Sequence, residues 1–254
     1  MKTTDNTILI TGGGSGIGRG LAEAFHRLGN QVIIAGRGQK ALDETTTANP
    51  GMKSLTLDVS DPKSIQSFAT QVTKDYPSLN VLINNAGIMR PENLLEASND
   101  LSTAEKTVTT NLLGPIRLTA ALLPSLRKQP RATIMTVSSG LAFVPFAVTP
   151  TYCATKAAIH SYSQSLRYQL KETNVEVIEL IPPYVQTTLM GDQQADDPRA
   201  MPLDEYINEA MSILKSQPDV KEVWVKKVYP LRFAAEGGQE KYESFFQNFN
   251  DTMS

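Results

Sequence analysis

The first 35 residues constrain the fold of this chain most strongly. A short apolar run over residues 7–10, TILI, leads directly into the glycine-rich sequence TGGGSGIG over residues 11–18. The segment RGLAEAFHRLG then repeats apolar side chains at helical spacing, and a second apolar run, QVIIA, follows over residues 31–35. Glycines at this place permit a tight turn and let backbone N–H groups approach a pyrophosphate. The sequence therefore predicts a β-α-β unit that binds a dinucleotide through Gly12, Ser15, Gly16, Ile17 and Gly18.

The alternation of apolar strands and helical stretches continues along the chain. Strands that alternate with helices form a parallel sheet, and right-handed crossovers place helices on both of its faces. We therefore expect one α/β domain over residues 1–254, a doubly wound Rossmann sheet of about seven strands with the cofactor across their carboxyl ends. The strands are predicted at residues 7–11, 31–35, 53–57, 79–83, 132–137 and 175–181, with a helix at 203–214 before a seventh strand at 222–227.

The sequence YCATK places a phenol and an ammonium four residues apart. On a helix, Tyr152 and Lys156 share one face, and a nearby cation favours the phenolate, so we expect Lys156 to lower the tyrosine pKa toward neutrality. Ser139, thirteen residues before Tyr152, supplies a hydroxyl for the substrate oxygen. A Y-x-x-x-K match alone also occurs in helices that carry a half-buried aromatic beside a solvated lysine. Together with the glycine-rich turn, it predicts a metal-free proton donor suited to carbonyl reduction.

The end of the second strand indicates which dinucleotide binds. This position faces the adenosine ribose, where a carboxylate would bind the 2′-hydroxyl of NAD. The chain has Ala35, Gly36 and Arg37 there, with no carboxylate to repel a 2′-phosphate and one guanidinium to grip it. We therefore expect NADP rather than NAD. The alternative is that Arg37 is a solvated surface arginine, and the glycine-rich loop itself carries Ser15 in place of a basic residue.

Five motifs follow one another in an order that identifies a family. They are TGGGSGIG, LDVS at residues 57–60, NNAG at 84–87, N-x-x-G at 111–114, and Ser139 followed by YCATK. In this order, about the first 190 residues resemble the short-chain dehydrogenase/reductase family. The resemblance implies a dimer or tetramer and a proton relay that Asn111 supports through Lys156. It also implies an adenine site at Asp58 and Val59, a ribose site at Asn85, Ala86 and Gly87, and a catalytic tetrad of Asn111, Ser139, Tyr152 and Lys156.

Several of these residues have a purely structural alternative. Asp58 could cap a loop, and the NNAG run could be a turn of residues that tolerate positive φ. Asn111 could be a buried amide that holds the backbone together. Ser138 competes with Ser139, but only Ser139 keeps the family's usual distance to Tyr152, so we take Ser138 as structural.

The loop after the sixth strand departs from the family. Pro182 and Pro183 stand where the family usually has Pro-Gly, and proline fixes φ and lacks an N–H. We therefore expect a stiffer loop over the nicotinamide, with Pro182 near the cofactor and Thr187 at the carboxamide position that the resemblance implies. The Pro-Pro variant and the later PLRF segment resemble a bacterial branch of DltE-like oxidoreductases.

A polar stretch and a set of apolar side chains are expected at the substrate end. Residues 191–202, GDQQADDPRAMP, carry two prolines and predict a mobile lid within a lid region over 188–216, whose closure excludes water. The apolar side chains suit an aryl or alkyl ketone, although each is equally explained as core. They are Met89, Leu141, Phe143, Phe146, Tyr184, Leu189 and Met190.

The C-terminal segment, residues 236–254, predicts a helix with an aromatic stripe. Tyr242, Phe245, Phe246 and Phe249 fall at helical spacing. Such a stripe either packs on its own domain or covers a neighbouring subunit. We expect the subunit contact, because exposed aromatic stripes commonly mark interfaces.

The composition excludes several classes of partner. The formal net charge is −2, so no basic surface for nucleic acid or for an anionic membrane is expected. No run approaches the ~20 apolar residues that span a bilayer, and no signal peptide is visible, so we expect a cytoplasmic protein. Cys153 has no second cysteine for an internal disulfide, and His26 and His160 lack the paired spacing of a metal site, so no metal is expected.

Together these features predict an NADP-dependent carbonyl reductase or alcohol dehydrogenase that acts on a small ketone, aldehyde or secondary alcohol. Tyr152 serves as general acid and base, Ser139 polarises the substrate oxygen, and Lys156 binds the cofactor ribose. Two alternatives stay open: a catalytically silent nucleotide sensor on the same fold, and a redox-assisted epimerase or dehydratase with tightly bound NAD. The complete tetrad favours the enzyme, and no residue pattern identifies its substrate.

Overall fold

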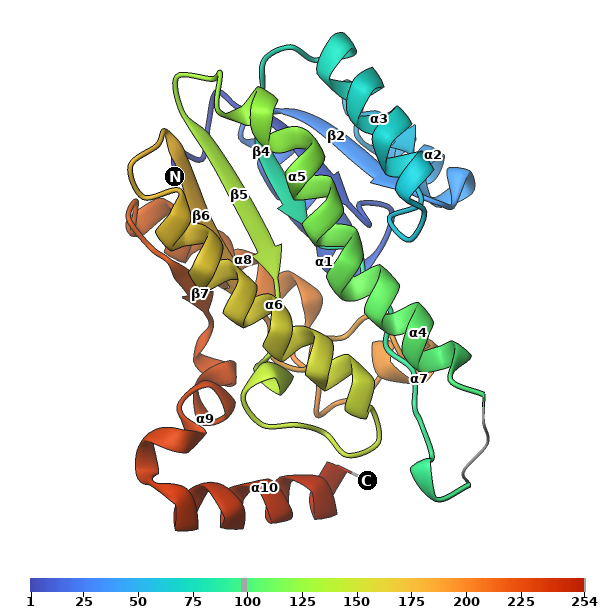
Figure 1. The fold of residues 1–254 in the computed structure, drawn as a ribbon, viewed down its shortest axis with the longest axis vertical. Helices are drawn as coiled ribbons and strands as arrows, with labels where there is room; N and C mark the ends of the chain where they lie inside the picture. Colours follow the sequence, from blue (N-terminus) through green and yellow to red (C-terminus); the bar gives the residue numbers. More distant parts are fainter. Residues whose placement is uncertain (97–99, 254) are drawn as a thin grey trace.

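Seven parallel strands form one sheet in the computed structural model, which describes residues 1–96 and 100–253 (Figure 1). Their order across the sheet is β3-β2-β1-β4-β5-β6-β7. The order reverses direction between β1 and β4, which opens a crevice at the carboxyl ends of these strands. The strands are β1 (Thr7–Thr11), β2 (Gln31–Gly36), β3 (Lys53–Thr56), β4 (Leu79–Asn84), β5 (Ala132–Val137), β6 (Val175–Ile181) and β7 (Glu222–Trp224).

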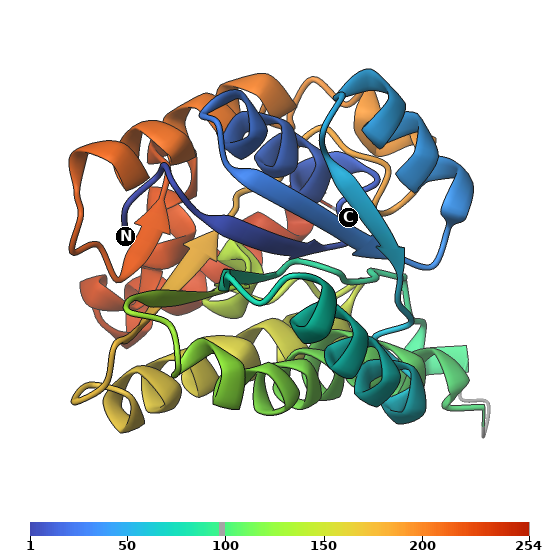
Figure 2. The same cartoon turned by 90° about the horizontal axis from the view of Figure 1, so that it is seen from above.

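Helices cover both faces of the sheet, and Figure 2 shows one layer on either side of it. One layer consists of α1 (Gly16–Arg27), α2 (Gln39–Ala48) and α8 (Leu203–Ser216). The other consists of α3 (Pro62–Asp75), α5 (Gly114–Leu126) and α6 (Pro150–Gln169). A wider π-helical turn, Thr109–Leu113, joins α4 (Ser102–Val108) to α5. The remaining helices are α7 (Asp192–Ala195), α9 (Tyr229–Arg232) and α10 (Gln239–Met253).

Two apolar cores fill the space between the sheet and its helices. A parallel strand that is buried on both faces needs a nearly continuous apolar run, and β1 meets this with Ile8 and Ile10 in one core and Leu9 in the other. The first core also contains Phe25 of α1 and Tyr206 of α8, while the second lies under α3, α5 and α6. This double burial explains why the strands appear in the sequence as apolar runs rather than as alternating patterns.

The predicted fold class is confirmed, and six of the strands lie where the sequence places them. The seventh strand is shorter than the predicted 222–227, because β7 ends at Trp224 and a 3₁₀ turn forms at Lys226–Val228. The reason lies in the neighbouring strand. Trp224 pairs with Ile181, the last residue of β6, and the following Pro182 has no N–H to continue the ladder.

The predicted lid region, 188–216, contains two kinds of structure. Residues 188–202 form a loop that includes α7, and Val185 and Met201 pair as an isolated bridge at its base. α8 instead belongs to the first core, where Tyr206 is fully buried. We therefore keep the lid proposal for residues 188–202 only.

The C-terminal helix α10 folds back on its own domain. Asn250 accepts the N–H of Ala147 through Oδ1 at 2.7 Å. Phe249 packs edge-on against Phe146, with ring centroids 6.1 Å apart. Phe249 is partly buried by this contact, so the alternative interpretation, packing on the same chain, describes this residue. The predicted segment 236–254 ends on a residue that lies outside the described part of the chain.

The substitution Gly18→Ala is expected to destabilise the fold. A Cβ at Gly18 would lie 2.3 Å from the carbonyl oxygen of Gly12 and 2.3 Å from Nδ2 of Asn85, so the turn would have to move. Overpacking of this kind costs about 1–3 kcal/mol, and we expect a lower midpoint of urea unfolding. Gly36→Ala is the control, because the nearest atom to a Cβ there is 3.8 Å away. An equal loss in both variants would contradict the steric explanation.

Candidate active site

A cavity of about 790 Å³ opens at the carboxyl ends of β1, β4, β5 and β6. Each strand contributes a residue that directly follows it: Gly12, Asn85, Ser138 and Pro182 respectively. The cavity therefore joins the predicted dinucleotide site to the predicted catalytic side chains. The predicted site residues that line it are Gly12, Ser15, Gly16, Ile17, Asn85, Ala86, Gly87, Ser139, Tyr152, Lys156, Pro182 and Thr187.

The glycine-rich turn has the shape that a dinucleotide needs. Gly12 and Gly16 adopt left-handed φ values of 68° and 50°, which glycine accommodates without strain. A Cβ at Gly12 would lie 2.9 Å from Nδ2 of Asn85, so only a glycine leaves this approach open. Thr11 ties the turn to the next strand end, because its Oγ1 accepts the N–H groups of Asn85 and Ala86, both at 3.0 Å. The N-terminus of α1 lies at this turn, where backbone N–H groups and the helix dipole can bind a pyrophosphate.

Ser139, Tyr152 and Lys156 line the same cavity as the glycine-rich turn. Tyr152 and Lys156 lie one turn apart on α6, and both side chains are almost completely buried. The Lys156 ammonium is 5.5 Å from the centroid of the Tyr152 ring and donates a hydrogen bond to the carbonyl oxygen of Val137 at 2.7 Å. Ser139 follows β5, and its Oγ accepts the N–H of Leu141 at 3.1 Å, so its hydroxyl proton stays available to another acceptor.

The pKa of the tyrosine differs from the prediction. Burial raises the pKa of Tyr152 above its ordinary value, and a hydrogen bond with Ser139 opposes this only in part. Burial also lowers the pKa of Lys156 from 10.5 to about 8, while the Glu179 carboxylate acts to raise it. The expected lowering of the tyrosine pKa is therefore wrong for this structure. The ammonium is bound to a backbone carbonyl instead of the phenol, and loss of solvent dominates.

Asn111 has the structural role that the sequence analysis left open. It lies in the π-helical turn, where its Oδ1 accepts the N–H of Ile88 and its Nδ2 donates to the carbonyl oxygen of Ile88, both at 2.8 Å. A Cβ at Gly87 would lie 3.4 Å from Asn111 Oδ1 and 3.8 Å from Lys156 Nζ. Asn111 therefore fixes the backbone beside the lysine, and its side chain does not line the cavity.

Asp58 also has a capping role. Its Oδ1 accepts the N–H of Ser60 at 2.9 Å and the hydroxyl of Ser60 at 2.6 Å. Partial burial acts to raise its pKa, but these hydrogen bonds and the charge of Arg37 hold the pKa of Asp58 below its ordinary value. Arg37 is exposed at the end of β2, close enough to act on this carboxylate. Among the described residues, the predicted site residues outside the cavity lining are Gly18, Arg37, Asp58, Val59 and Asn111.

The loop after β6 lies against the glycine-rich turn. A Cβ at Gly16 would lie 3.3 Å from Cγ2 of Thr187, and Oγ1 of Thr187 accepts a hydrogen bond from Gln194 of α7 at 3.1 Å. The carbonyl oxygen of Pro182 accepts the N–H of Gly140 at 2.9 Å, which holds the start of the loop to the residue after Ser139. The loop after β6 therefore contacts both the glycine-rich turn and the residue next to Ser139.

Six of the seven apolar residues predicted for the substrate cavity line it, and Phe143 does not. The Phe143 ring packs against His160, with ring centroids 4.7 Å apart. The guanidinium of Arg232 lies 4.6 Å from the centroid of the Phe143 ring. Sequence spacing could not reveal this, because the 3₁₀ turn at Gly140–Ala142 redirects the chain.

The sequence analysis missed the wall that α9 and α10 build. Phe249 and Met253 of α10 and Leu231 of α9 line the cavity. The aromatic stripe of the C-terminal segment was a visible signal for part of this wall, but we assigned it to a subunit contact. Arg90 and Arg199 also line the cavity, and neither was expected there.

Comparisons with known proteins show to which family this chain belongs. Residues 6–198 match the short chain dehydrogenase family. The chain is 41% identical over 253 residues to an uncharacterized oxidoreductase, DltE, of Bacillus subtilis (strain 168), and the match covers 98% of each protein. A solved short chain dehydrogenase from Burkholderia cenocepacia J2315 in complex with NADP has a TM-score of 0.82 at 22% identity, covering 97% of this chain and 99% of that one. A short chain dehydrogenase/reductase from Burkholderia phymatum in complex with NAD has a TM-score of 0.79 at 21% identity, covering 93% and 95%.

The chain therefore belongs to the short-chain dehydrogenase family and is an oxidoreductase of that family. Its similarity to the DltE oxidoreductase extends over nearly the whole chain, which confirms the resemblance seen in the motifs and in the Pro-Pro loop. Within residues 1–96 and 100–253, no helix has the length and apolar character needed to cross a membrane.

The buried ammonium of Lys156 should make the stability of the fold depend on pH. Its pKa of about 8 in the folded protein lies below the ordinary 10.5, so between these pH values the unfolded chain binds the proton more tightly than the folded chain does. The unfolding free energy of the wild-type protein should therefore rise, relative to that of Lys156→Met, by about 2–3 kcal/mol as the pH goes from about 7 to about 10. Urea unfolding of both proteins at both pH values measures this. A difference between the two proteins that stays constant with pH would contradict the depressed lysine pKa.

Proposed function

We propose that this protein is an NADP-dependent carbonyl reductase that also oxidises the corresponding secondary alcohol. The observation that carries the proposal is the meeting of Ser139, Tyr152 and Lys156 in one buried cavity that the glycine-rich turn also lines. When bound, NADPH supplies the hydride for the carbonyl carbon. The catalytic work of the chain is then to orient the carbonyl, to provide a proton and to exclude water.

Tyr152 provides the proton during reduction. A phenol keeps its proton at neutral pH at its ordinary pKa of 10.0, and the burial that raises the pKa of Tyr152 favours this protonated form further, which is the form that an acid catalyst needs. Its hydroxyl gives the proton to the carbonyl oxygen, and the Ser139 hydroxyl donates a hydrogen bond to the same oxygen. In the reverse direction, the phenolate of Tyr152 accepts the proton of the alcohol.

Lys156 stabilises the phenolate that remains after Tyr152 has given up its proton. With a pKa of about 8, Lys156 carries its positive charge in most of the molecules at neutral pH. This charge lies beside the tyrosine ring. The same ammonium is placed to bind the cofactor ribose. Asn111 holds the backbone beside it and supports the return of a proton through Lys156.

NADP is the proposed cofactor because of Arg37. This side chain is exposed at the end of β2 and forms no ion pair among the described residues, so it is available to a 2′-phosphate. No carboxylate stands in residues 35–37 to bind the 2′-hydroxyl of NAD. The two solved relatives contain NADP and NAD respectively, so the preference rests on the residues of this chain.

The proposed substrate is a ketone with an alkyl or aryl substituent. Apolar side chains from several separate segments line the cavity. Leu189 and Met190 belong to the loop 188–202 and are more than a third exposed, with 39% and 36% of their surfaces accessible. Closure of this loop over a substrate would cover them and exclude water from the reacting carbonyl.

We further propose that the protein acts in the cytoplasm on a small molecule, as a homodimer or homotetramer built on α5 and α6. The family resemblance supports the oligomer, and the net charge of −2 offers no basic surface for nucleic acid or an anionic membrane. Light scattering at the exit of a size-exclusion column distinguishes a monomer, a dimer and a tetramer.

The substitution Tyr152→Phe should abolish most carbonyl reduction while NADPH still binds. It removes the proton donor and leaves the ring in place, and general acid catalysis of this kind contributes about 10²–10⁴-fold in rate. Turnover is followed through the absorbance of NADPH with a panel of ketones and aldehydes, and binding through NADPH fluorescence. Tyr162→Phe on the same helix is the control, because Tyr162 does not line the cavity. Unchanged turnover in Tyr152→Phe would refute the assignment of the proton donor.

The substitution Arg37→Asp should move the cofactor preference toward NADH. It replaces a bidentate phosphate donor with a carboxylate that repels the 2′-phosphate, and we expect the ratio of kcat/KM for NADPH to that for NADH to fall by about 10²-fold or more. Arg27→Asp repeats the charge reversal at the exposed last turn of α1 and should leave the ratio unchanged. Equal use of NADPH by the Arg37 variant and the wild-type protein would show that another group binds the phosphate.

A further inference from the structure

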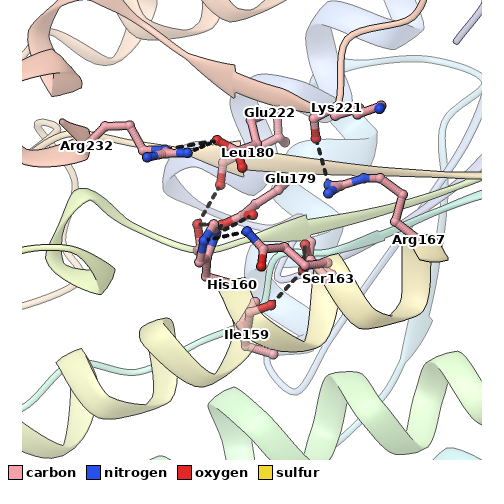
Figure 3. A network of polar contacts seen from close by, with 12 residues as sticks. Ile159, His160, Ser163, Arg167, Glu179, Leu180, Lys221, Glu222 and Arg232 are labelled. Atoms are coloured by element: carbon pink, nitrogen blue, oxygen red, sulfur yellow. Dashed lines mark hydrogen bonds and ion pairs between the residues drawn. The ribbon is translucent and has the colours of Figure 1, made fainter. Parts of the chain in front are cut away.

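A buried carboxylate lies directly behind the catalytic side chains. Glu179 is on β6, has no exposed surface and does not line the cavity. Its Oε1 accepts a hydrogen bond from the hydroxyl of Ser138, the residue before Ser139. His160 of α6 approaches the same carboxylate, with Nδ1 at 3.1 Å from Oε1 and 2.8 Å from Oε2, as Figure 3 shows.

The surroundings of His160 hold its ring against Glu179. Nε2 lies 3.0 Å from the side-chain nitrogen of Gln164. Because a carboxylate oxygen can only accept a hydrogen bond, Nδ1 donates to Glu179. The edge of the Phe143 ring packs on the imidazole, with centroids 4.7 Å apart. His160 is therefore a hydrogen-bond donor that holds the Glu179 carboxylate in its position.

Lys156 is the cationic side chain whose pKa Glu179 affects. Tyr152, Lys156 and His160 lie at i, i+4 and i+8 on α6 and thus share one face of the helix. The Glu179 carboxylate acts to raise the lysine pKa against the effect of burial.

The carboxylate that lies opposite Glu179 in the sheet is already paired. Glu222 of β7 is its partner in the sheet register, and the Arg232 guanidinium binds Glu222 at 2.8 Å. Ligand atoms of His160, Glu179 and Glu222 lie within 4.8 Å of one another, but Arg232 already occupies Glu222 and would repel a metal ion. In the described part of the chain, Glu179 has no ion pair with a lysine or an arginine.

We propose that Glu179 is a positioning residue of the active site, and that Ser138 and His160 hold its carboxylate as the counter-charge of Lys156. This inference rests on the proposed function for its catalytic meaning, because a charged Lys156 is what the carbonyl reductase needs to stabilise the Tyr152 phenolate. Glu179 contacts neither substrate nor cofactor and acts through the lysine. The hydrogen bond from Ser138 also fixes the strand end that carries Ser139.

A titration of Lys156 tests the inference without any turnover. In protein whose lysines are labelled with ¹³C at Cε, the resonance that disappears in Lys156→Met is the one to follow between about pH 6 and about pH 11. The wild-type midpoint is expected near 8. In Glu179→Gln the midpoint should fall by about one pH unit or more, because a nearby opposite charge has been removed while the side-chain volume is kept. Glu176→Gln makes the same change at the partly exposed end of β6 and should leave the midpoint unchanged.

Two variants of His160 test whether its hydrogen bond to Glu179, and not only its bulk, affects the pKa of Lys156. His160→Leu removes the donor to Glu179 and should lower the Lys156 midpoint, whereas His160→Asn places an N–H near the position of Nδ1 and should restore most of it. If Glu179→Gln does not fold, this pair of variants decides the question. A Lys156 midpoint within about 0.2 units of the wild-type value in each variant that folds would overturn the proposal.

Kinetics then connect the inference to the proposed reaction. If the protein reduces ketones, the alkaline limb of its kcat/KM profile should move to lower pH in Glu179→Gln by the same amount as the lysine midpoint. An alkaline limb that stays in place while the midpoint moves would overturn the counter-charge role in catalysis. Absence of turnover in the wild-type protein would refute the proposed function, and the titration would still decide whether Glu179 controls the charge of Lys156.

Discussion

The buried hydrogen bond from Lys156 to the carbonyl oxygen of Val137 is the interaction on which the rest of the site depends. An almost completely buried lysine loses most of its hydration, and a single backbone acceptor at 2.7 Å restores only part of it. This bond fastens α6 to the end of β5, so that the helix carrying Tyr152 and the strand end carrying Ser139 keep one relative position. The doubly wound fold makes this possible, because it brings the carboxyl ends of β4, β5 and β6 to the same edge.

Burial shifts the pKa values of the two titratable side chains of the site in opposite directions: it raises the pKa of Tyr152 and lowers that of Lys156. Burial favours the neutral forms of both Tyr152 and Lys156, and only the lysine has a buried carboxylate behind it to oppose this effect. The result at neutral pH is a protonated phenol beside a charged amine. Pairs of groups whose surroundings set their protonation states separately are a common basis of acid and base catalysis. The hydrogen bonds of Ser138 and His160 to Glu179 show that this balance extends beyond the cavity wall.

Local patterns predicted most of the fold and the cofactor turn. The glycine-rich loop, the apolar runs of the strands and the i, i+4 spacing on α6 each depend on residues close together in the sequence, so they were visible there. The contacts that the sequence did not reveal join distant segments. Ser138 and Glu179 are 41 residues apart, and Ala147 and Asn250 are 103 residues apart. For the same reason the sign of the tyrosine pKa shift was missed, because burial is set by the whole packing and helical spacing reports only the neighbouring charge.

The position of α10 has a consequence for how such enzymes diversify. The match to the family ends at residue 198, whereas Phe249 and Met253, which close the apolar end of the cavity, lie in the last turns of a helix that begins at Gln239. One part of the cavity wall thus lies outside the stretch that matches the family. Mutation or exchange of the terminal stretch can therefore reshape this wall while the residues that match the family stay unchanged.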